Sequence, residues 1–121
     1  MVKRVISTNI VLRLLISDLR KYANQYKAPV WDAVADILSK SSRRRPAVNL
    51  SKISRYSGEG DVIVVPGKVL GSGTLNKRIT VAAFSFSKTA LDKIKASGSR
   101  SMTIRDLLKE NPEGRGVKII I

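Results

Sequence analysis

The chain has 121 residues, of which 23 are lysine or arginine and 9 are aspartate or glutamate, so its formal net charge at pH 7 is +14. It contains no cysteine and no histidine, which excludes disulfide scaffolds, zinc fingers, thiol nucleophiles and imidazole acid–base catalysis. A hydrophobic fraction of 43% suffices for the core of one domain, but no apolar run approaches the roughly 18 residues that cross a bilayer, so we expect a cytoplasmic protein without membrane contact.

Two helices are predicted before residue 41. Residues 10–26 carry apolar side chains at spacings of three and four, the pattern of an amphipathic helix. Its predicted buried stripe comprises Val11, Leu15, Leu19, Tyr22 and Tyr26. Pro29 restarts the chain, and a second apolar stripe predicts a helix over residues 30–40. We expect Trp31, in this second stripe, to lie between the two helices.

An acid-free stretch follows, between Asp36 and Glu59, and it is dense in cations. These cations are Lys40, Arg43, Arg44, Arg45, Lys52 and Arg55. Like charges at this density repel one another unless a polyanion offsets them, which favours a nucleic-acid partner over a solvated basic loop kept for solubility. Arginine suits such a partner because its planar fork contacts phosphate bidentately and stacks on bases. Apolar residues are scattered without a period between 47 and 56, so we expect an irregular connector or a short edge strand there.

The next segment reads as two strands separated by a glycine-rich loop. Residues 61–65 are rich in β-branched side chains and predict a short strand that ends at Pro66-Gly67. Residues 79–86 are apolar at both alternating sets of positions, which predicts a strand covered on both faces. The glycines between them fit neither a P-loop nor a dinucleotide-binding fingerprint. They predict a tight turn, or a loop whose backbone approaches RNA beside Lys68, Lys77 and Arg78.

The C-terminal third predicts two short helices and a final strand. Ser87 is a predicted N-cap for a helix that stops at Gly98, and Thr103 opens a capping-box pattern. Residues 117–121 predict the last strand. A buried strand, helical segments and a final strand favour a layered α/β fold with a right-handed crossover. We expect residues 1–46 to form a helical and basic extension and residues 47–121 an α/β core, within a single structural domain.

Nothing in the sequence indicates catalysis, a metal site or a cofactor. Glu59 and Asp61 flank Gly60 among many cations, and we interpret them as a charge-balanced turn. The alternative that they leave open is a paired-carboxylate hydrolase or magnesium site. The common DNA-reading modules and the aromatic motif of an RRM sheet are missing, so the chain reads as a protein that recognises phosphate and shape.

Longer segments of the sequence carry a family resemblance. The run RRRPAVNLSKISRYSGEGDVIVVPGKVLGSGTLNKRITVAAFSFSKTALDKI, from Arg43 to Ile94, closely resembles large-subunit ribosomal protein eighteen of archaea and eukaryotes. That family is related to bacterial large-subunit protein fifteen. The segments APVWDAVADILSK (28–40) and NPEGRGVKIII (111–121) are similar to the same family, and the short archaeal form is the nearer match.

The resemblance implies an α/β fold of irregular ββα turns with an N-terminal helical extension. It also implies a non-catalytic, ribosome-bound protein whose partners are large-subunit ribosomal RNA and neighbouring large-subunit proteins, with no small-molecule substrate. Charge and resemblance together predict the RNA-facing residues Arg43, Arg44, Arg45, Lys52, Arg55, Lys68, Lys77 and Arg78, with Lys3, Arg4 and Arg115 as further candidates. The alternative from a different class is an architectural protein that acts on DNA or as an RNA chaperone.

Overall fold

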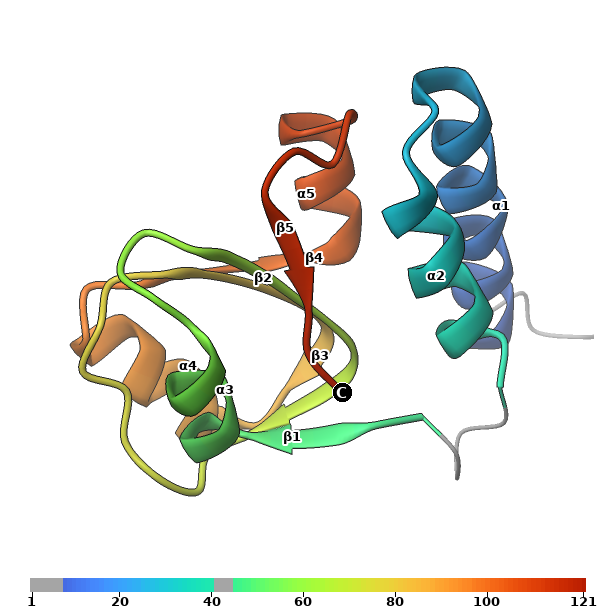
Figure 1. Ribbon diagram of the computed structural model, residues 1–121. Coiled ribbons are helices and arrows are strands. Elements are labelled where there is room, and N and C mark those ends of the chain that lie inside the picture. The colour runs from blue at the N-terminus through green and yellow to red at the C-terminus, as the bar shows by residue number, and fades with distance from the viewer. Residues whose placement is uncertain (1–7, 41–44) are drawn as a thin grey trace, which may run out of the picture.

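A parallel β-sheet lies between two groups of helices in this protein, as a computed structural model shows (Figure 1). The structure describes residues 8–40 and 45–121. The strands are β1 (Ala47–Asn49), β2 (Val62–Leu70), β3 (Thr80–Phe86), β4 (Arg100–Thr103) and β5 (Val117–Ile119). The order is β1-β2-β3-β4, and β5 pairs with β2 as well. Every pairing is parallel. The α/β fold class is therefore confirmed.

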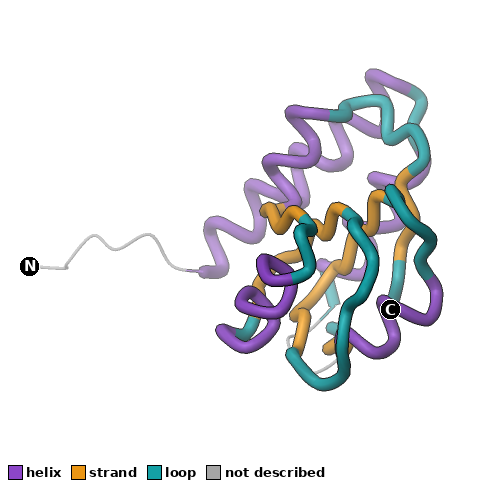
Figure 2. Tube along the Cα trace, turned by 90° about the vertical axis from the view of Figure 1, so that its left-hand side faces the viewer, coloured by secondary structure: helices purple, strands orange, loops and turns teal. Residues whose placement is uncertain are grey.

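Helices α1 (Thr8–Tyr26) and α2 (Pro29–Leu38) form a hairpin along one side of the strands (Figures 1 and 2). The chain turns at Lys27, whose φ of 51° lies in the left-handed region, and the Ala28 N–H donates to the Ala23 carbonyl at 3.0 Å. These features are typical of a Schellman-type helix end. Two expected helices are thus confirmed, each within about two residues of the predicted bounds.

The buried stripe of α1 differs from the predicted one. It is formed by Leu12, Leu15, Leu19 and Ala23. The predicted members Val11 and Tyr26 are 46% and 39% exposed, so both assignments are wrong. The N-terminal half of α1 has apolar residues on most of its circumference, and periodicity alone does not choose among them. Packing against α2 and α5 decides which side is covered.

Strand β2 runs through Pro66-Gly67, where the sequence predicted that it would end. The register against β3 shifts between Val65 and Lys68, so the pair lies in a β-bulge. A bulge tolerates proline because the extra residue needs no ladder hydrogen bond. Beyond the bulge, Lys68 pairs with Ala47 of β1 on one side and with Ser85 of β3 on the other. The residues before and after the bulge therefore form one long strand. On one of its edges, β5 pairs with the first half of β2 and β1 pairs with its end.

Two more elements were not predicted as such. Helix α3 (Leu50–Tyr56) replaces the expected irregular connector and buries Leu50 and Ile53. Strand β4 forms the far edge of the sheet, with side chains that are exposed or half-buried along its length. The short edge strand expected near residue 47 is present as β1.

The remaining helices, α4 (Lys88–Ala96) and α5 (Ile104–Glu110), begin at the predicted caps. The Ser87 side chain accepts from the Ala90 N–H at 3.1 Å, and the Thr103 hydroxyl accepts from the Asp106 N–H at 3.1 Å. Helices α1, α2 and α5 cover one face of the sheet, and α3 and α4 cover the other. Each face has its own hydrophobic cluster, so β2 and β3 are buried on both sides, as predicted for residues 79–86.

Candidate nucleic-acid interface

Most carboxylates in the described part of the chain form ion pairs with lysine or arginine side chains. The ion pairs are Asp18–Arg105, Asp32–Arg20, Asp36–Arg20, Asp61–Lys118, Glu110–Arg100 and Glu113–Arg115. In addition, Glu59 accepts the Arg78 backbone N–H at 2.6 Å. Exposed pairs of this kind contribute little to stability because solvent screens them. Their main consequence is that few negative charges are left to compensate the other cations.

Many exposed lysines and arginines form no side-chain hydrogen bond or ion pair within residues 8–40 and 45–121. They are Arg13, Lys21, Lys27, Lys40, Arg55, Lys68, Arg78, Lys88, Lys95 and Lys109. Three of them, Arg55, Lys68 and Arg78, belong to the predicted RNA-binding set. Unpaired cations on a rigid surface are the groups that release counterions when they meet phosphate.

One group of candidate residues lines a hollow where β1, β2 and β3 meet, which we call the Phe84 hollow. Its volume is about 370 Å³, and it is lined by Arg45, Pro46, Ala47, Gly67, Lys68, Phe84 and Ser85. The Arg45 guanidinium carbon lies 5.4 Å from the centre of the Phe84 ring, within cation–π range. The bulge at Pro66-Gly67 directly precedes Lys68, and a bulge re-aims the side chains beside it. The structure therefore brings two predicted cations, Arg45 and Lys68, to one site.

A second group lies on and beside α3, and we call it the α3 surface: Lys52, Arg55, Tyr56 and Arg78. The Lys52 ammonium donates to the Ile121 backbone oxygen at 2.6 Å. Arg55 has no partner in the described residues, and the neighbouring Tyr56 side chain is 57% exposed. Arg78 follows Lys77, whose ammonium is bonded to the end of α3, and the Arg78 side chain extends past Gly98, which follows α4. The arrangement offers both cations and an aromatic ring to solvent.

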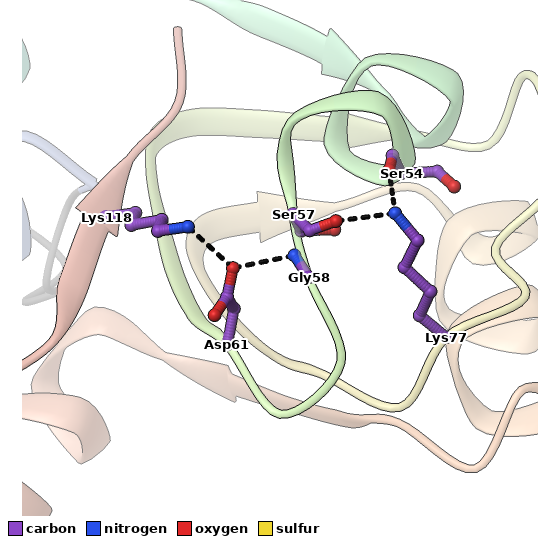
Figure 3. A network of polar contacts seen from close by, with 6 residues as sticks. All are labelled: Ser54, Ser57, Gly58, Asp61, Lys77 and Lys118. Atoms are coloured by element: carbon purple, nitrogen blue, oxygen red, sulfur yellow. Dashed lines mark hydrogen bonds and ion pairs between the residues drawn. The ribbon is translucent and has the colours of Figure 1, made fainter.

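Lys77 itself is engaged within the protein (Figure 3). Its ammonium donates to the carbonyl oxygens of Ser54 and Ser57, at 2.7 Å and 2.5 Å. These carbonyls lie at the C-terminal end of α3, where a helix favours a cation. Lys77 therefore ties the loop before β3 to α3, and its charge is less available to an outside phosphate than that of Arg78.

The other candidates fall outside the two surfaces. Arg115 is in the turn before β5, and its side chain is 83% exposed although it pairs with Glu113 at 2.8 Å. Lys3, Arg4, Arg43 and Arg44 lie outside the described residues. The described members of the predicted set are thus distributed over several parts of the molecule and do not form a single patch.

The interpretation of Glu59 and Asp61 as a charge-balanced turn agrees with the structure (Figure 3). Asp61 accepts from the Lys118 ammonium at 2.8 Å and from the Gly58 N–H at 2.7 Å. These two hydrogen bonds, the one from Lys118 being the stronger cause, hold the pKa of the Asp61 carboxyl below its ordinary value of 3.8. Among the described residues, no group of three or more acidic side chains is placed to hold a metal ion.

The lowered pKa of Asp61 predicts an effect of acid on stability. A carboxyl whose pKa is lower in the folded than in the unfolded chain stabilises the fold above its unfolded pKa, and this contribution is lost as pH falls through the folded pKa. The unfolding free energy should therefore fall less steeply below about pH 4 in Asp61→Asn than in the unaltered protein. Denaturant unfolding between about pH 2 and pH 6 measures it. Asp92→Asn, which removes a carboxylate without an ion pair in the described residues, is the matched control; equal slopes for both variants would contradict the prediction.

Two residues, one in the Phe84 hollow and one beside Asp61, were not selected from the sequence as functional. Phe84 reads as one more apolar residue of a buried strand, and nothing local indicates that its ring is only half-buried beside Arg45. Lys118 carries no sequence signal because its partner Asp61 is 57 residues away. Both assignments depend on tertiary neighbours.

Comparison with known proteins bears on what these surfaces do. Residues 1–121 match the family described as "Ribosomal protein 60S L18 and 50S L18e". The chain belongs to this family. Relatives named "Large ribosomal subunit protein eL18" include one from Methanococcus maripaludis, 48% identical with 98% of each chain covered. Another, from Methanothermobacter thermautotrophicus, is 47% identical with 99% of each chain covered, and one from Methanopyrus kandleri is 48% identical with 93% covered.

Membership of this ribosomal protein family confirms the resemblance read from the sequence and makes the chain a structural protein, not an enzyme. Within the family, the paired carboxylates at Asp61 and Glu59 have a structural explanation that needs no reaction. A search of the described residues finds no helix with the length and apolar character of a membrane span.

Proposed function

We propose that this protein, a structural constituent of the large ribosomal subunit, binds large-subunit ribosomal RNA at the Phe84 hollow and the α3 surface. The observation that carries the proposal is the charge pairing. Most carboxylates pair with local partners, while the side chains of Arg55, Lys68 and Arg78 are exposed and have no partner among residues 8–40 and 45–121. Binding is then driven mainly by phosphate contacts that release counterions, with little dependence on base sequence.

The fold supports this role because it fixes the cations on rigid elements. Lys68 lies on a strand that is paired on both edges, and Arg55 lies on a helix whose Leu50 and Ile53 are buried. Because the backbone that carries these cations is already ordered, binding restricts only their side-chain rotamers. This lowers the entropic cost of association. The two surfaces come from different elements, so RNA segments could be held from more than one side.

The exposed apolar part of α1 supports contact with neighbouring large-subunit proteins. Val11 and Leu14, one helical turn apart, are 46% and 57% exposed, and Val11 also lines a hollow of about 260 Å³. Contiguous exposed apolar side chains commonly mark protein contacts. Crosslinking from a photoreactive residue at position 14 in assembled subunits would identify the partner.

The triple variant Arg55→Gln/Lys68→Gln/Arg78→Gln tests RNA binding. If each cation contacts one phosphate, the slope of log affinity against log salt should become less steep by about 2–3, at about 0.7–0.9 per contact. Affinity for in vitro transcribed large-subunit ribosomal RNA, measured over a salt series, gives this slope. Duplex DNA also offers phosphates, so it is the competitor that tests the architectural alternative. Weaker competition by DNA than by unlabelled RNA would show recognition of RNA shape, whereas equal competition would favour the alternative.

Lys21→Gln/Lys88→Gln/Lys109→Gln is the matched control, because it removes the same net charge from exposed cations on α1, α4 and α5. Its slope should change less than that of the first triple variant. Equal effects of the two variants would show that total charge matters and position does not, which would overturn the proposed surfaces. Sucrose-gradient sedimentation of tagged protein, with RNase-treated samples beside it, then tests whether the variants still enter large subunits.

A further inference from the structure

The Phe84 hollow combines features that phosphate binding alone does not require. A phosphate needs a cation at the surface, whereas this site has an aromatic ring, a guanidinium group and the apolar side chain of Pro46 around a recess. Its volume of about 370 Å³ is in the range of small-ligand pockets, roughly 300–1,000 Å³. RNA-binding proteins commonly receive unstacked bases on aromatic rings or on the planar faces of arginine.

Arg45 supplies a second unusual feature. Its Nε–H is shielded from solvent and has no hydrogen-bond partner in the described structure. A buried donor without an acceptor is unfavourable, so the position of Arg45 over Phe84 is not strongly preferred in the free protein. A ligand that offers an acceptor at this point would be bound in part because it satisfies the donor. Phosphate oxygens and 2′-hydroxyl groups of RNA are acceptors of this kind.

We propose that the Phe84 hollow captures one unstacked RNA base between the Phe84 ring and the Arg45 guanidinium, with Lys68 contacting an adjacent phosphate. A base sandwiched between two planar groups needs them about 7 Å apart, twice the roughly 3.4 Å spacing of nucleotides along a stacked strand. The Arg45 guanidinium carbon lies 5.4 Å from the centre of the Phe84 ring, which is too close to admit a base, so Arg45 has to move outward. The same movement frees its Nε–H, which lies in the guanidinium plane and points away from the stacked base, to donate to a sugar or phosphate oxygen of a neighbouring nucleotide. Lys68 lines the hollow and is exposed, which places a cation where the backbone of the captured nucleotide would pass.

This inference rests on the proposed function, because it specifies how one of the two RNA-binding surfaces works. An acidic protein segment is the other polyanion that could be attracted to Arg45 and Lys68. RNA is favoured because an aromatic ring binds a flat aromatic ligand by stacking, and every base has a flat aromatic face. A carboxylate peptide would use the two cations and leave the ring without a matching partner.

The test compares a short oligouridylate with an oligomer of the same length and backbone that carries abasic tetrahydrofuran residues in place of nucleotides. The full chain should bind the base-bearing oligomer about tenfold more tightly at about 0.1 M salt. In Arg45→Lys, which keeps the charge and loses the planar group, this preference should fall to near unity while the salt slope is unchanged. Phe84→Leu, which keeps an apolar side chain, should do the same. Lys68→Gln should weaken both oligomers by similar factors and reduce the salt slope.

Each outcome has a distinct meaning. Equal, salt-dependent binding of both oligomers by the unaltered protein would overturn base capture and leave phosphate binding intact. No salt-dependent binding of either oligomer would contradict the proposed function, and base capture with it. Competition by a polyglutamate peptide that equals competition by oligouridylate would show that the hollow recognises acidic chains in general and would also overturn base capture. Thermal melts of Arg45→Lys and Phe84→Leu establish that both variants are folded at the assay temperature.

Discussion

Replacing Trp31 with alanine is expected to lower the free energy of unfolding by about 3–5 kcal/mol. Trp31 is 0% exposed and belongs to the cluster that α1 and α2 share with α5 and the sheet. Its indole N–H also donates to the Pro112 carbonyl at 2.9 Å, which ties α2 to the segment between α5 and β5. Truncation removes the largest buried side chain of the core and leaves that carbonyl without its donor.

Trp31→Phe separates the two contributions. It keeps most of the apolar contact and removes the hydrogen bond, so its own cost should be about 0.5–1.5 kcal/mol for the neutral hydrogen bond plus a term for the lost volume. This total should be smaller than the cost of the alanine variant, which loses the ring contacts as well. Denaturant unfolding of the three proteins measures both effects. A melting temperature of Trp31→Ala close to that of the unaltered protein would show that the helical hairpin is not part of the cooperative core.

The elements predicted correctly are those whose pattern is long or whose caps are local. Helices α1 and α2 show several repeats of a 3.6-residue period, and Ser87 and Thr103 act within three residues of their own positions. Helix α3 has only seven residues and two buried ones, so its period is not evident among polar neighbours. Strand β4 has no fully buried side chain, and its place in the sheet is fixed by backbone pairing to β3.

The sequence predicts which types of residue form the candidate site. It does not predict which of these side chains are bonded within the protein and which are exposed. Lys77 and Arg78 are adjacent in the sequence, yet one is bonded to two carbonyls of the α3 end and the other is exposed without a side-chain partner in the described residues. The difference depends on the packing of a loop against a helix about twenty residues away. Charge density therefore indicates a polyanion partner, whereas the choice of contacting cations requires the tertiary structure.

Gly67→Ala is the second substitution with a large expected effect. A Cβ at Gly67 would lie 2.0 Å from the Pro46 carbonyl oxygen, a backbone atom that also accepts the Lys68 N–H at 3.0 Å. Neither group can move away without breaking the start of the β1–β2 pairing. We expect the unfolding free energy to fall by about 3 kcal/mol or more, at the upper end for overpacking. Because Gly67 and Pro46 both line the Phe84 hollow, RNA affinity should fall as well.

Gly58→Ala is the matched control for this substitution. A Cβ there would meet nothing closer than 3.6 Å, and that neighbour is the Asp61 side chain rather than backbone. Its stability should stay within about 1 kcal/mol of the unaltered protein, since replacing an unstrained glycine mainly reduces the freedom of the unfolded chain. If Gly67→Ala were as stable as Gly58→Ala, β1 would not lie against the bulge as the structure has it. The Phe84 hollow depends on that contact. Arg45 and Pro46 directly precede β1, and the pairing of β1 with β2 places them beside Lys68 and Phe84.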